Sequence, residues 1–457
     1  MSRNKLILWV ALVLLIILVL AFAFQVRRLQ KQLRSSVRII PAESKSREDV
    51  AQNELYRDAA RSSRPEVLVK FRSGVSENTI EQITARFNDQ LQDEIEAVPG
   101  LTTIDDPDDA EAVAIAARYQ ALPEVEYAEP NYEISLDQAS SDERLVNDPR
   151  LADEWWLANI RAAQAWATTK GSSAIVIAIL DSGVEYTHPD LVNNIWQRPA
   201  NITPYQDRDL GTIDDVHGYN AVSNDGAPLD DNGHGTSCAG IIGAECGNNR
   251  GICGVNWTTQ IMPLKFMNAG GFGTVADALE AVNYAIDRKR AGVNLRIINA
   301  SWGLAQPSRA LEDVIRKAYE AGILFVAAAG SISANNDTTP HYPASYNTGN
   351  IISVAAVDQS EALAPFSNYG AKSVNIAAPG TDILTTALGN EYERRSGTSL
   401  AAPVVTGVAA LALSARPEMS VDQLRRLLLE SVDKRPGLRG KVSTAGRINA
   451  ARAMARK

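Results

Sequence analysis

Three short motifs contain residue types that together could activate a serine hydroxyl. Asp181 ends an apolar run and is followed by Ser-Gly, His234 lies between two glycines, and Ser399 lies in Ser-Gly-Thr-Ser-Leu-Ala-Ala-Pro. A serine becomes a strong nucleophile when a histidine takes its proton and a buried carboxylate orients that histidine. The order Asp, His, Ser therefore supplies the groups needed for nucleophilic catalysis.

Each motif taken alone also has a structural interpretation. An aspartate at a strand end can cap a turn or hold a metal, and a histidine between glycines can be purely structural. Ser399 precedes an apolar run with Pro403 in its first turn, so it could simply cap a helix. A capping role does not account for the small residues on both sides of it. Nucleophilic catalysis is therefore a hypothesis about the three motifs together.

Apolar runs alternate with helical patterns after Leu151. This alternation predicts an α/β fold with a doubly wound, mostly parallel sheet. In such a sheet the chemistry lies beyond the carboxyl ends of the strands. The expected helices include Val275–Arg290 and Arg309–Ala321. The expected strands are Ala174–Leu180, Ile261–Phe266, Arg296–Ala300, Ile323–Ala328, Ile351–Val357 and Val374–Ala377.

A smaller α+β domain is expected before this sheet, at residues 65–136. Its pattern is strand–helix–strand–strand–helix–strand, which is typical of a ferredoxin-like sandwich. The second helix is expected to open at Pro107 and to end near Leu122, and the last extended segment is Val125–Leu136. A polar connector, residues 137–148, is expected to be exposed and to lead into the large domain, residues 149–457.

The first residues suggest a membrane segment. Leu6–Phe24 contains no charge, so residues 1–24 are expected to form a hydrophobic helix, either a membrane anchor or a cleaved signal segment, and residues 25–64 a polar stalk. The cations after this helix favour a cytoplasmic body by the positive-inside rule. The remainder of the 457-residue chain is more acidic than the net charge of −9, because no acid precedes Glu43. This acidity argues against nucleic acid as a partner.

The three cysteines define no disulfide framework. Cys246 and Cys253 bracket a glycine-containing loop and could pair in an oxidising compartment, but buried free thiols are the favoured interpretation for them.

The motifs DSG at Asp181, GHGT at His234 and GTSLAAP at Ser399 resemble those of the subtilisin-like serine proteases, the subtilases. The resemblance covers roughly Asn147–Ala455. It implies a serine endopeptidase with Asp181, His234 and Ser399 as its triad, acting on protein or peptide substrates. Two further segments resemble the walls of the family's substrate cleft, namely Ser301, Trp302 and Gly303, and Ala328, Ala329 and Gly330.

The smaller domain resembles the family's inhibitor-type propeptide, through VLVKF at Val67 and VEYAEPNY at Val125. Such a propeptide blocks the cleft and is removed by the enzyme itself. The resemblance implies a zymogen that cuts itself within residues 137–148. A self-inhibited protease fits a place outside the cytoplasm, membrane-anchored or secreted, and this expectation is preferred to the charge rule.

One position departs from the family's pattern. After Ala-Ala-Gly the family has an asparagine, whose amide and the N–H of the nucleophile stabilise the oxyanion, and here that residue is Ser331. Either Ser331 or the nearby Asn335 or Asn336 supplies the donor, or turnover is weak. The alternative function is a subtilase-like pseudoprotease that binds peptides and at most processes itself.

The resemblance also implies structural calcium. Asp190 and Asn248 would supply side-chain oxygens, and Glu245, Arg250 and Ile252 backbone carbonyls. A second site could involve Asn220 and Asp225, although solvated loop charge is slightly favoured there. His341 lies near the mouth of the family's substrate pocket, where it could favour acidic side chains, but a surface histidine is the favoured interpretation. Leu400 replaces the methionine usual beside the nucleophile.

Overall fold

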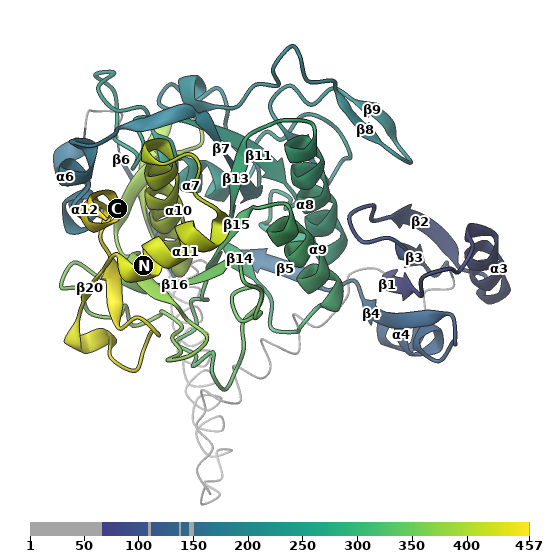
Figure 1. Ribbon diagram of the computed structural model, residues 1–457. Coiled ribbons are helices and arrows are strands. Elements are labelled where there is room, and N and C mark those ends of the chain that lie inside the picture. Colours follow the sequence, from purple (N-terminus) through teal and green to yellow (C-terminus); the bar gives the residue numbers. More distant parts are fainter. Residues whose placement is uncertain (1–65, 108–110, 137–138, 146–149, 457) are drawn as a thin grey trace, which may run out of the picture. The chain divides into compact units, whose positions relative to one another are not determined.

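The computed structural model describes residues 66–107, 111–136, 139–145 and 150–456 (Figure 1). The expected membrane segment at residues 1–24 and stalk at 25–64 lie outside the described residues. Among the helices that the structure describes, one is long and apolar enough to cross a membrane, namely α10 (Thr398–Ala415). However, 89% of that helix is buried in the protein, so it is a core helix.

The smaller domain has the expected order of elements. Its antiparallel sheet has the order β2-β3-β1-β4, and its second helix begins at Ala112, later than Pro107 suggested. The elements are β1 (Glu66–Phe71), α3 (Glu77–Phe87), β2 (Gln90–Glu94), β3 (Leu101–Asp105), α4 (Ala112–Gln120) and β4 (Val125–Pro130).

The alternation along β1 gives this small sheet two buried faces. Val67, Val69 and Phe71 pack with α3 and α4 in one apolar cluster. Leu68 belongs to a different cluster, which also contains helices of the large domain. Successive side chains of a strand point to opposite faces, so β1 presents one face to its own helices and the other to the large domain.

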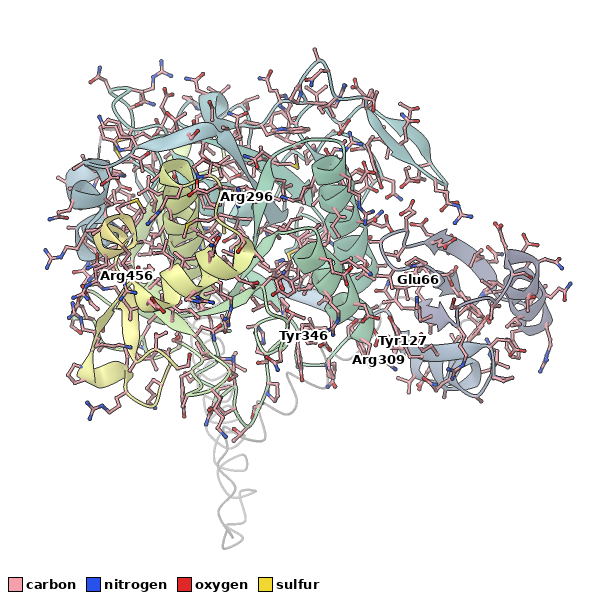
Figure 2. The ribbon with its side chains drawn as sticks, in the orientation of Figure 1. Glu66, Tyr127, Arg296, Arg309, Tyr346 and Arg456 are labelled. Atoms are coloured by element: carbon pink, nitrogen blue, oxygen red, sulfur yellow. A yellow bond between two sulfur atoms is a disulfide. The ribbon has the colours of Figure 1, made fainter. Side chains whose placement is uncertain are left out.

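Polar contacts join the two domains around β4. The hydroxyl of Tyr127 donates to Asp313 Oδ2 at 2.8 Å, and the guanidinium carbon of Arg309 lies 4.1 Å from the centre of the Tyr127 ring (Figure 2). Both partners lie on α9 (Arg309–Glu320). This surface of the small domain therefore recognises one particular helix of the large domain.

The large domain contains the predicted parallel sheet, in the order β10-β11-β7-β13-β15-β16-β17-β21-β20. Only β20 runs antiparallel to its neighbour. Six predicted strands are confirmed, with small shifts of their ends. The bounds are β7 (Gly171–Asp181), β10 (Tyr219–Asn220), β11 (Thr258–Lys265), β13 (Leu295–Ala300), β15 (Leu324–Ala328), β16 (Ile351–Val357), β17 (Ile376–Pro379), β20 (Val432–Lys434) and β21 (Gly446–Ile448).

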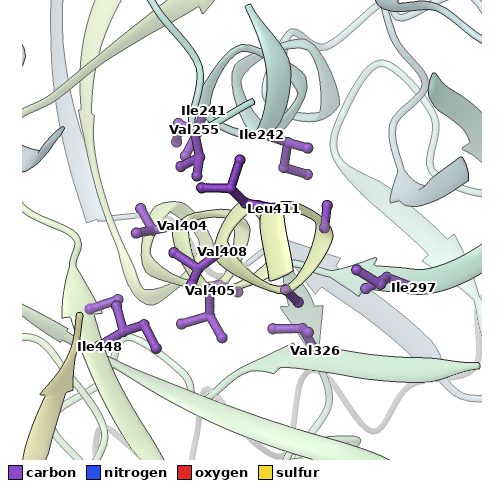
Figure 3. Close-up of a cluster of buried hydrophobic side chains, with 14 of the residues drawn as sticks. Ile241, Ile242, Val255, Ile297, Val326, Val404, Val405, Val408, Leu411 and Ile448 are labelled. Atoms are coloured by element: carbon purple, nitrogen blue, oxygen red, sulfur yellow. The ribbon is translucent and has the colours of Figure 1, made fainter. Parts of the chain in front are cut away.

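Helices cover both faces of this sheet. Ile175, Ile177 and Ile179 of β7 pack with α7 (His234–Gly243) and α10, whereas the alternate residues of β7 pack with α8 (Val275–Arg290) and α9. Figure 3 shows α10 surrounded by apolar side chains of α7 and of the neighbouring strands. The continuous apolar run of α10 is required because protein surrounds the helix on all sides.

Two short strands of the segment after β4 join the large domain. β5 (Glu133–Leu136) pairs antiparallel with both β12 (Phe272–Thr274) and β14 (Trp302–Gly303). β6 (Ala139–Leu145) pairs with β19 (Glu391–Ser396), which in turn pairs with β18 (Ile383–Ala387). The connector expected to be exposed thus forms a strand in its middle, because the open edge of β19 supplies backbone partners for it.

The remaining α-helices and short strands complete the large domain. The α-helices are α5 (Trp155–Asn159), α6 (Ala162–Trp166), α11 (Val421–Glu430) and α12 (Ala450–Ala455). The short strands are β8 (Tyr205–Asp207) and β9 (Gly211–Ile213), which form a hairpin.

A disulfide joins Cys246 and Cys253. The expectation of free thiols is therefore wrong for these two residues. The loop between them turns back on itself, because Asn248 and Ile252 both donate to Asp190, and this brings the two sulfur atoms together. Cys238 is a free and buried cysteine.

Candidate active site

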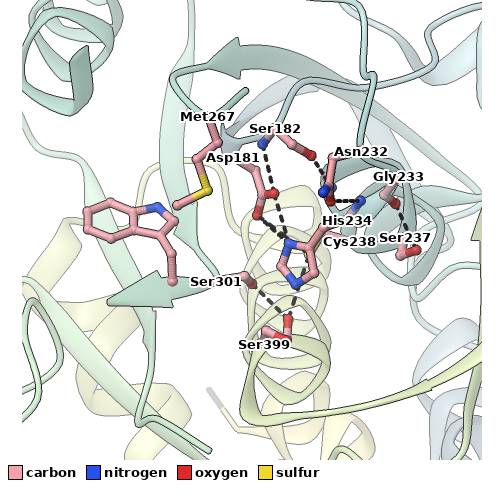
Figure 4. A network of polar contacts seen from close by, with 12 residues as sticks. Asp181, Ser182, Asn232, Gly233, His234, Ser237, Cys238, Met267, Ser301 and Ser399 are labelled. Carbon is pink, nitrogen blue, oxygen red and sulfur yellow. Dashed lines mark hydrogen bonds and ion pairs between the residues drawn. The ribbon is translucent and has the colours of Figure 1, made fainter. Parts of the chain in front are cut away.

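Asp181 and His234 form a buried pair. Nδ1 of His234 lies 2.8 Å and 3.0 Å from the two carboxylate oxygens of Asp181, and neither side chain is exposed (Figure 4). The last residue of β7 and the first residue of α7 are thus in direct contact. Because Nδ1–H donates to the carboxylate, Nε2 is the nitrogen that can accept a proton.

A second aspartate, Asp230, fixes the start of α7. Its Oδ1 accepts from Ser182 Oγ and from the N–H of Gly233, both at 2.9 Å, and its Oδ2 accepts from the N–H and the hydroxyl of Thr236. No role was assigned to Asp230 from the sequence. The signal available was the spacing from Asp230 to Thr236 at a helix start, where free N–H groups need an acceptor.

Ser399 lies in the first turn of α10 and is buried. Its carbonyl accepts the hydroxyl of Ser301 at 2.8 Å, and the sulfur of Cys238 lies 3.7 Å from the same carbonyl and 4.0 Å from Asp181 Oδ2. Within the described residues, Ser399 Oγ and His234 Nε2 are both buried and form no hydrogen bond. The structure therefore gathers the three predicted residues at one edge of the sheet.

The thiol of Cys238 completes a group with Asp181 and His234 whose ligand atoms all lie within 4.8 Å of one another. Metals bind the thiolate form of cysteine. Burial raises the pKa of Cys238 well above its usual value, with the charge of Asp181 adding to the effect. A protonated, buried thiol packs here as a small apolar side chain.

Ser331 contacts the residue before Ser399. Its Oγ accepts the N–H of Thr398 at 3.1 Å and lies 3.1 Å from the hydroxyl oxygen of Thr398. Asn336 is turned elsewhere, since its Nδ2 donates to Ala329 O, and Asn335 Oδ1 accepts the N–H of Asp337. Of the three candidate donors, Ser331 is the one whose side chain bonds to the turn that carries Ser399.

The predicted cleft residues border β5. Trp302 lies opposite Leu136 and Gly303 opposite Ser135 in the antiparallel pairing, while Ser301 contacts Ser399 directly. The Nε1–H of Trp302 donates to Leu180 O at 2.8 Å, which ties this strand to β7. Ala328 is the last residue of β15, Ala329 and Gly330 follow it, and the N–H of Gly330 donates to the hydroxyl of Thr398.

His341 is buried, with 7% of its surface exposed, so the expectation of a surface histidine is wrong. A side chain at Gly303 would meet its Nε2 at 2.1 Å, and a side chain at Gly330 would meet its Cδ2 at 3.1 Å. The imidazole is therefore enclosed between the two wall segments of the cleft.

The two side chains expected to bind calcium, Asp190 and Asn248, bond to each other and to neighbouring donors. The carboxylate of Asp190 is buried and accepts three donors, namely Asn248 Nδ2 at 2.8 Å, the N–H of Ile252 at 3.0 Å and the hydroxyl of Tyr392 at 2.9 Å. Asn248 Oδ1, the other expected side-chain ligand, accepts the N–H of Arg250. Calcium requires six to eight oxygen ligands, and donors already surround this carboxylate, so the arrangement does not fit the ion.

The second expected site is an ordinary turn. Asn220 and Asp225 pair through their backbones, Asp225 accepts Ser223 Oγ and the N–H of Ala227, and Asn220 Oδ1 accepts the N–H of Val222. Both side chains therefore bond to donors within their own turn, and we assign no ion here.

Comparison with known proteins identifies the family. The profile of the subtilase family, peptidase S8, matches residues 172–446. The chain belongs to the subtilase family. A second profile, the fervidolysin N-terminal prodomain, matches residues 59–131 of this subtilase. Its membership makes it a serine-type endopeptidase of the subtilisin family, preceded by a prodomain, as the motifs indicated.

Relatives agree with this assignment. A thermophilic serine proteinase of Bacillus sp. (strain AK1) is 35% identical and is matched over 80% of this chain and 86% of its own length. Thermitase of Thermoactinomyces vulgaris is 34% identical, over 67% of this chain and 98% of its own. The crystal structure of fervidolysin from Fervidobacterium pennivorans has a TM-score of 0.67 at 24% identity, and the match covers 86% of this chain and 61% of that one. This last likeness supports the fold.

Proposed function

We propose that this subtilase hydrolyses peptide bonds with Ser399 as nucleophile, His234 as general base and Asp181 as the group that orients His234. The observation that carries the proposal is the buried pair between His234 Nδ1 and Asp181, formed beside the first turn of α10. That pairing fixes the tautomer in which Nε2 can accept the Ser399 proton.

The reaction runs in two matched halves. As the Oγ–carbon bond forms, the hydroxyl proton of Ser399 moves to His234 Nε2 and the carbonyl electron pair moves to oxygen. The tetrahedral intermediate then expels the amine, which takes the proton from Nε2, and an acyl-enzyme remains. Water attacks the acyl-enzyme by the same proton route and regenerates the serine.

The oxyanion of this intermediate needs donors that are already in place. We assign the N–H of Ser399 at the start of α10 as one donor, and the rotatable hydroxyl of Ser331 as the other. Ser331 already bonds to the Thr398 turn, so its oxygen lies next to the nucleophile. A hydroxyl reaches less far than an asparagine amide, so we expect slower turnover than an amide donor would give.

The prodomain acts as an inhibitor within the same chain. Support comes from β5, which pairs with β12 on one side and β14 on the other, as an extended peptide added to two open strand edges does. A peptide substrate would need the same edges. The enzyme is thus made as a zymogen and must cut itself, within residues 137–148, before substrates can enter.

An oxidising compartment is the place that suits this protein best. The Cys246–Cys253 disulfide supports it, because such bonds persist outside the cytoplasm. Leu6–Phe24 either anchors the zymogen to a membrane or is a cleaved signal segment. The size and first residue of the isolated zymogen distinguish the two.

An alkyl fluorophosphonate probe, which reacts with activated serines, tests the proposed function. The self-processed enzyme should be labelled at Ser399, and Ser399→Ala should abolish both labelling and self-processing. Ser414→Ala removes a hydroxyl from the other end of α10 and should change neither. A processed enzyme that resists the probe would instead be a peptide-binding pseudoprotease.

A further inference from the structure

The pairing of β5 indicates where a substrate residue meets the nucleophile. Leu136 lies opposite Trp302 and Ser135 opposite Gly303. A peptide that continues this antiparallel register by one residue places that next residue opposite Ser301. The hydroxyl of Ser301 bonds to Ser399 itself. The residue after the Leu136 position is therefore the one whose carbonyl Ser399 would attack, called P1 below.

His341 lies between the two wall segments, where a P1 side chain would meet it. Its imidazole is in contact with both wall segments, since a Cβ on Gly303 would lie 2.1 Å from Nε2 and one on Gly330 would lie 3.1 Å from Cδ2. Both glycines leave room for the ring that a larger residue would remove. The ring therefore forms the floor between the two walls that flank Ser399.

The backbone holds this ring in place. The N–H of His341 donates to Ser345 Oγ at 3.1 Å, and the next residue, Tyr342, exchanges two backbone hydrogen bonds with Leu304 at 2.8 and 2.9 Å. His341 is thus attached to the strand that continues from Gly303. A rigid floor of this kind discriminates between side chains better than a mobile loop does.

The remaining wall residues are neutral. They are Ser301, Trp302, Gly303, Ala328, Ala329, Gly330 and Asn368. The side-chain amide of Asn368 already donates to Asn336 Oδ1 at 3.0 Å. Among the residues around this position, only His341 has a side chain of a type that can carry a positive charge. A carboxylate is the side chain that such a floor recognises.

We propose that His341 is a specificity-determining residue that selects aspartate or glutamate at P1. The proposal rests on the proposed function and adds the substrate class to it. It also names the bond that the zymogen cuts first. In this chain the residue after Leu136 is Asp137, so the sequence has an acidic residue at the proposed P1 position, and the proposed cut is between Asp137 and Gln138.

A matched peptide series tests the preference. Peptides that differ only at P1, carrying Glu, Asp, Gln or Leu, are assayed with the processed enzyme. We expect kcat/KM for Glu or Asp to exceed that for Gln and Leu by at least about tenfold, as expected when a site built for a polar partner meets an analogue without it. Equal values for Glu and Leu would overturn the proposal.

Two substitutions separate the role of His341 from general damage. His341→Gly should lower kcat/KM for acidic P1 residues about 10- to 100-fold and raise it for Leu, because it removes the donor and opens the floor. His341→Gln keeps a donor of similar length without the charge and should lie between the two. Fluorophosphonate labelling at Ser399 in each variant shows whether the nucleophile is still active. Loss of the acidic preference with labelling intact supports the proposal, and unchanged preference in His341→Gly refutes it.

The self-cleavage bond gives an independent arm. The processed enzyme should begin at Gln138, Asp137→Leu should slow processing at least tenfold, and adding His341→Gly should restore much of the rate. Asp142→Leu, an identical change within the same connector, should have little effect. A processed enzyme that begins elsewhere would refute the assigned bond. Failure of the wild-type enzyme to label or to cut any peptide would instead refute the proposed function itself.

Discussion

The hydroxyl oxygen of Ser331 accepts the backbone N–H of Thr398 at 3.1 Å, which ties the segment after β15 to the residue immediately before the nucleophile. The N–H of Gly330 donates to the hydroxyl of the same threonine. Two neighbouring segments of the cleft are thus joined through one residue. In this arrangement Ser331 both supports the turn that carries Ser399 and lies where an oxyanion donor is needed.

Replacing this serine with the family's residue should accelerate the enzyme. An asparagine amide reaches further than a hydroxyl and donates from a fixed plane, so Ser331→Asn should raise kcat. A well-placed oxyanion donor contributes about 10²- to 10³-fold in kcat. Because Ser331 already supplies part of this, we expect an increase of about 10- to 100-fold. Steady-state kinetics on a small peptide substrate, with KM followed separately, measures the effect.

The matched control for this change is Ser333→Asn. Ser333 is exposed and has φ of 61°, a conformation that asparagine adopts readily. It should leave kcat unchanged. If Ser331→Asn were also without effect, or lowered kcat, another group would already fill the oxyanion position.

The loop around Asp190 should depend on its disulfide and be insensitive to metal removal. Three protein donors satisfy the buried carboxylate, and the Cys246–Cys253 bond closes the loop. Excess EDTA should therefore leave the apparent Tm unchanged. Reduction, or Cys246→Ser combined with Cys253→Ser, should lower it by several degrees, since closing a loop of this length contributes about 2–3 kcal/mol. A large fall in Tm with EDTA alone would show that a bound metal ion such as calcium does stabilise this loop.

The sequence predicted those parts of the molecule that depend on local pattern. The strands of the large sheet are continuous apolar runs, and Asp181, His234 and Ser399 lie at element ends within short motifs, so their meeting at one edge followed from parallel-sheet topology. The order of strands and helices in the small domain was likewise predicted from its periodicity. These features need no knowledge of distant contacts.

Other features depend on contacts between distant segments and could not be read from the chain. Asp230 looks like a loop acid until Ser182 and Thr236 are brought to it. His341 looks like a surface residue until Gly303 and Gly330 enclose it. Likewise the pairing of Cys246 with Cys253 follows from how the loop wraps around Asp190.

Glu129 of the prodomain should determine how firmly the prodomain is held. Its carboxylate accepts the N–H of Arg309 at 2.8 Å, the N–H of Ala310 at 3.3 Å and the hydroxyl of Ser308, which caps α9. A negative charge at a helix N-terminus is favourable. Glu129→Gln keeps the shape but removes the charge, and losses of this kind cost about 1–2 kcal/mol. We expect activity to appear about 5- to 30-fold faster after self-cleavage.

The control for this substitution is Glu81→Gln, which removes a carboxylate from an exposed position on α3. It should leave the rate unchanged, because α3 packs on the face of the small sheet that carries Val67 and Val69. An unchanged rate in Glu129→Gln itself would show that the contacts of Tyr127 hold the prodomain without help from the charge.

Carboxylates from both domains converge between β2 and α8, around a cavity of about 440 Å³. Burial, a hydrogen bond to Asp209 and the charge of Asp207 raise the pKa of Asp93 to about 8. Burial likewise raises the pKa of Glu280 well above its usual range. Burial also raises the pKa of Glu96. The guanidinium of Arg208 bonds to Glu94. The backbone N–H of Arg208 and the side-chain amide of Asn283 both donate to Glu96. The docked prodomain thus holds protons that these groups would otherwise release.

Docking of the prodomain should therefore weaken as pH rises towards 8. Separated from Glu280 and Asp209, Asp93 regains its ordinary pKa of 3.8 and is ionised above pH 5, whereas the docked form stays protonated until about pH 8. The contribution of Asp93 to docking is fully present below its ordinary pKa and is lost as pH rises to about 8. Over this range the equilibrium constant for docking falls by at most about tenfold per pH unit.

The measurement is the rate at which activity appears, divided by the activity of fully activated enzyme at the same pH. This ratio should rise from pH 5 to 8. Asp93→Asn should flatten this profile, and Glu111→Gln, an exposed change on the same domain, should keep it. If Asp93→Asn leaves the pH profile unaltered, protonation of another group must cause the pH dependence of docking.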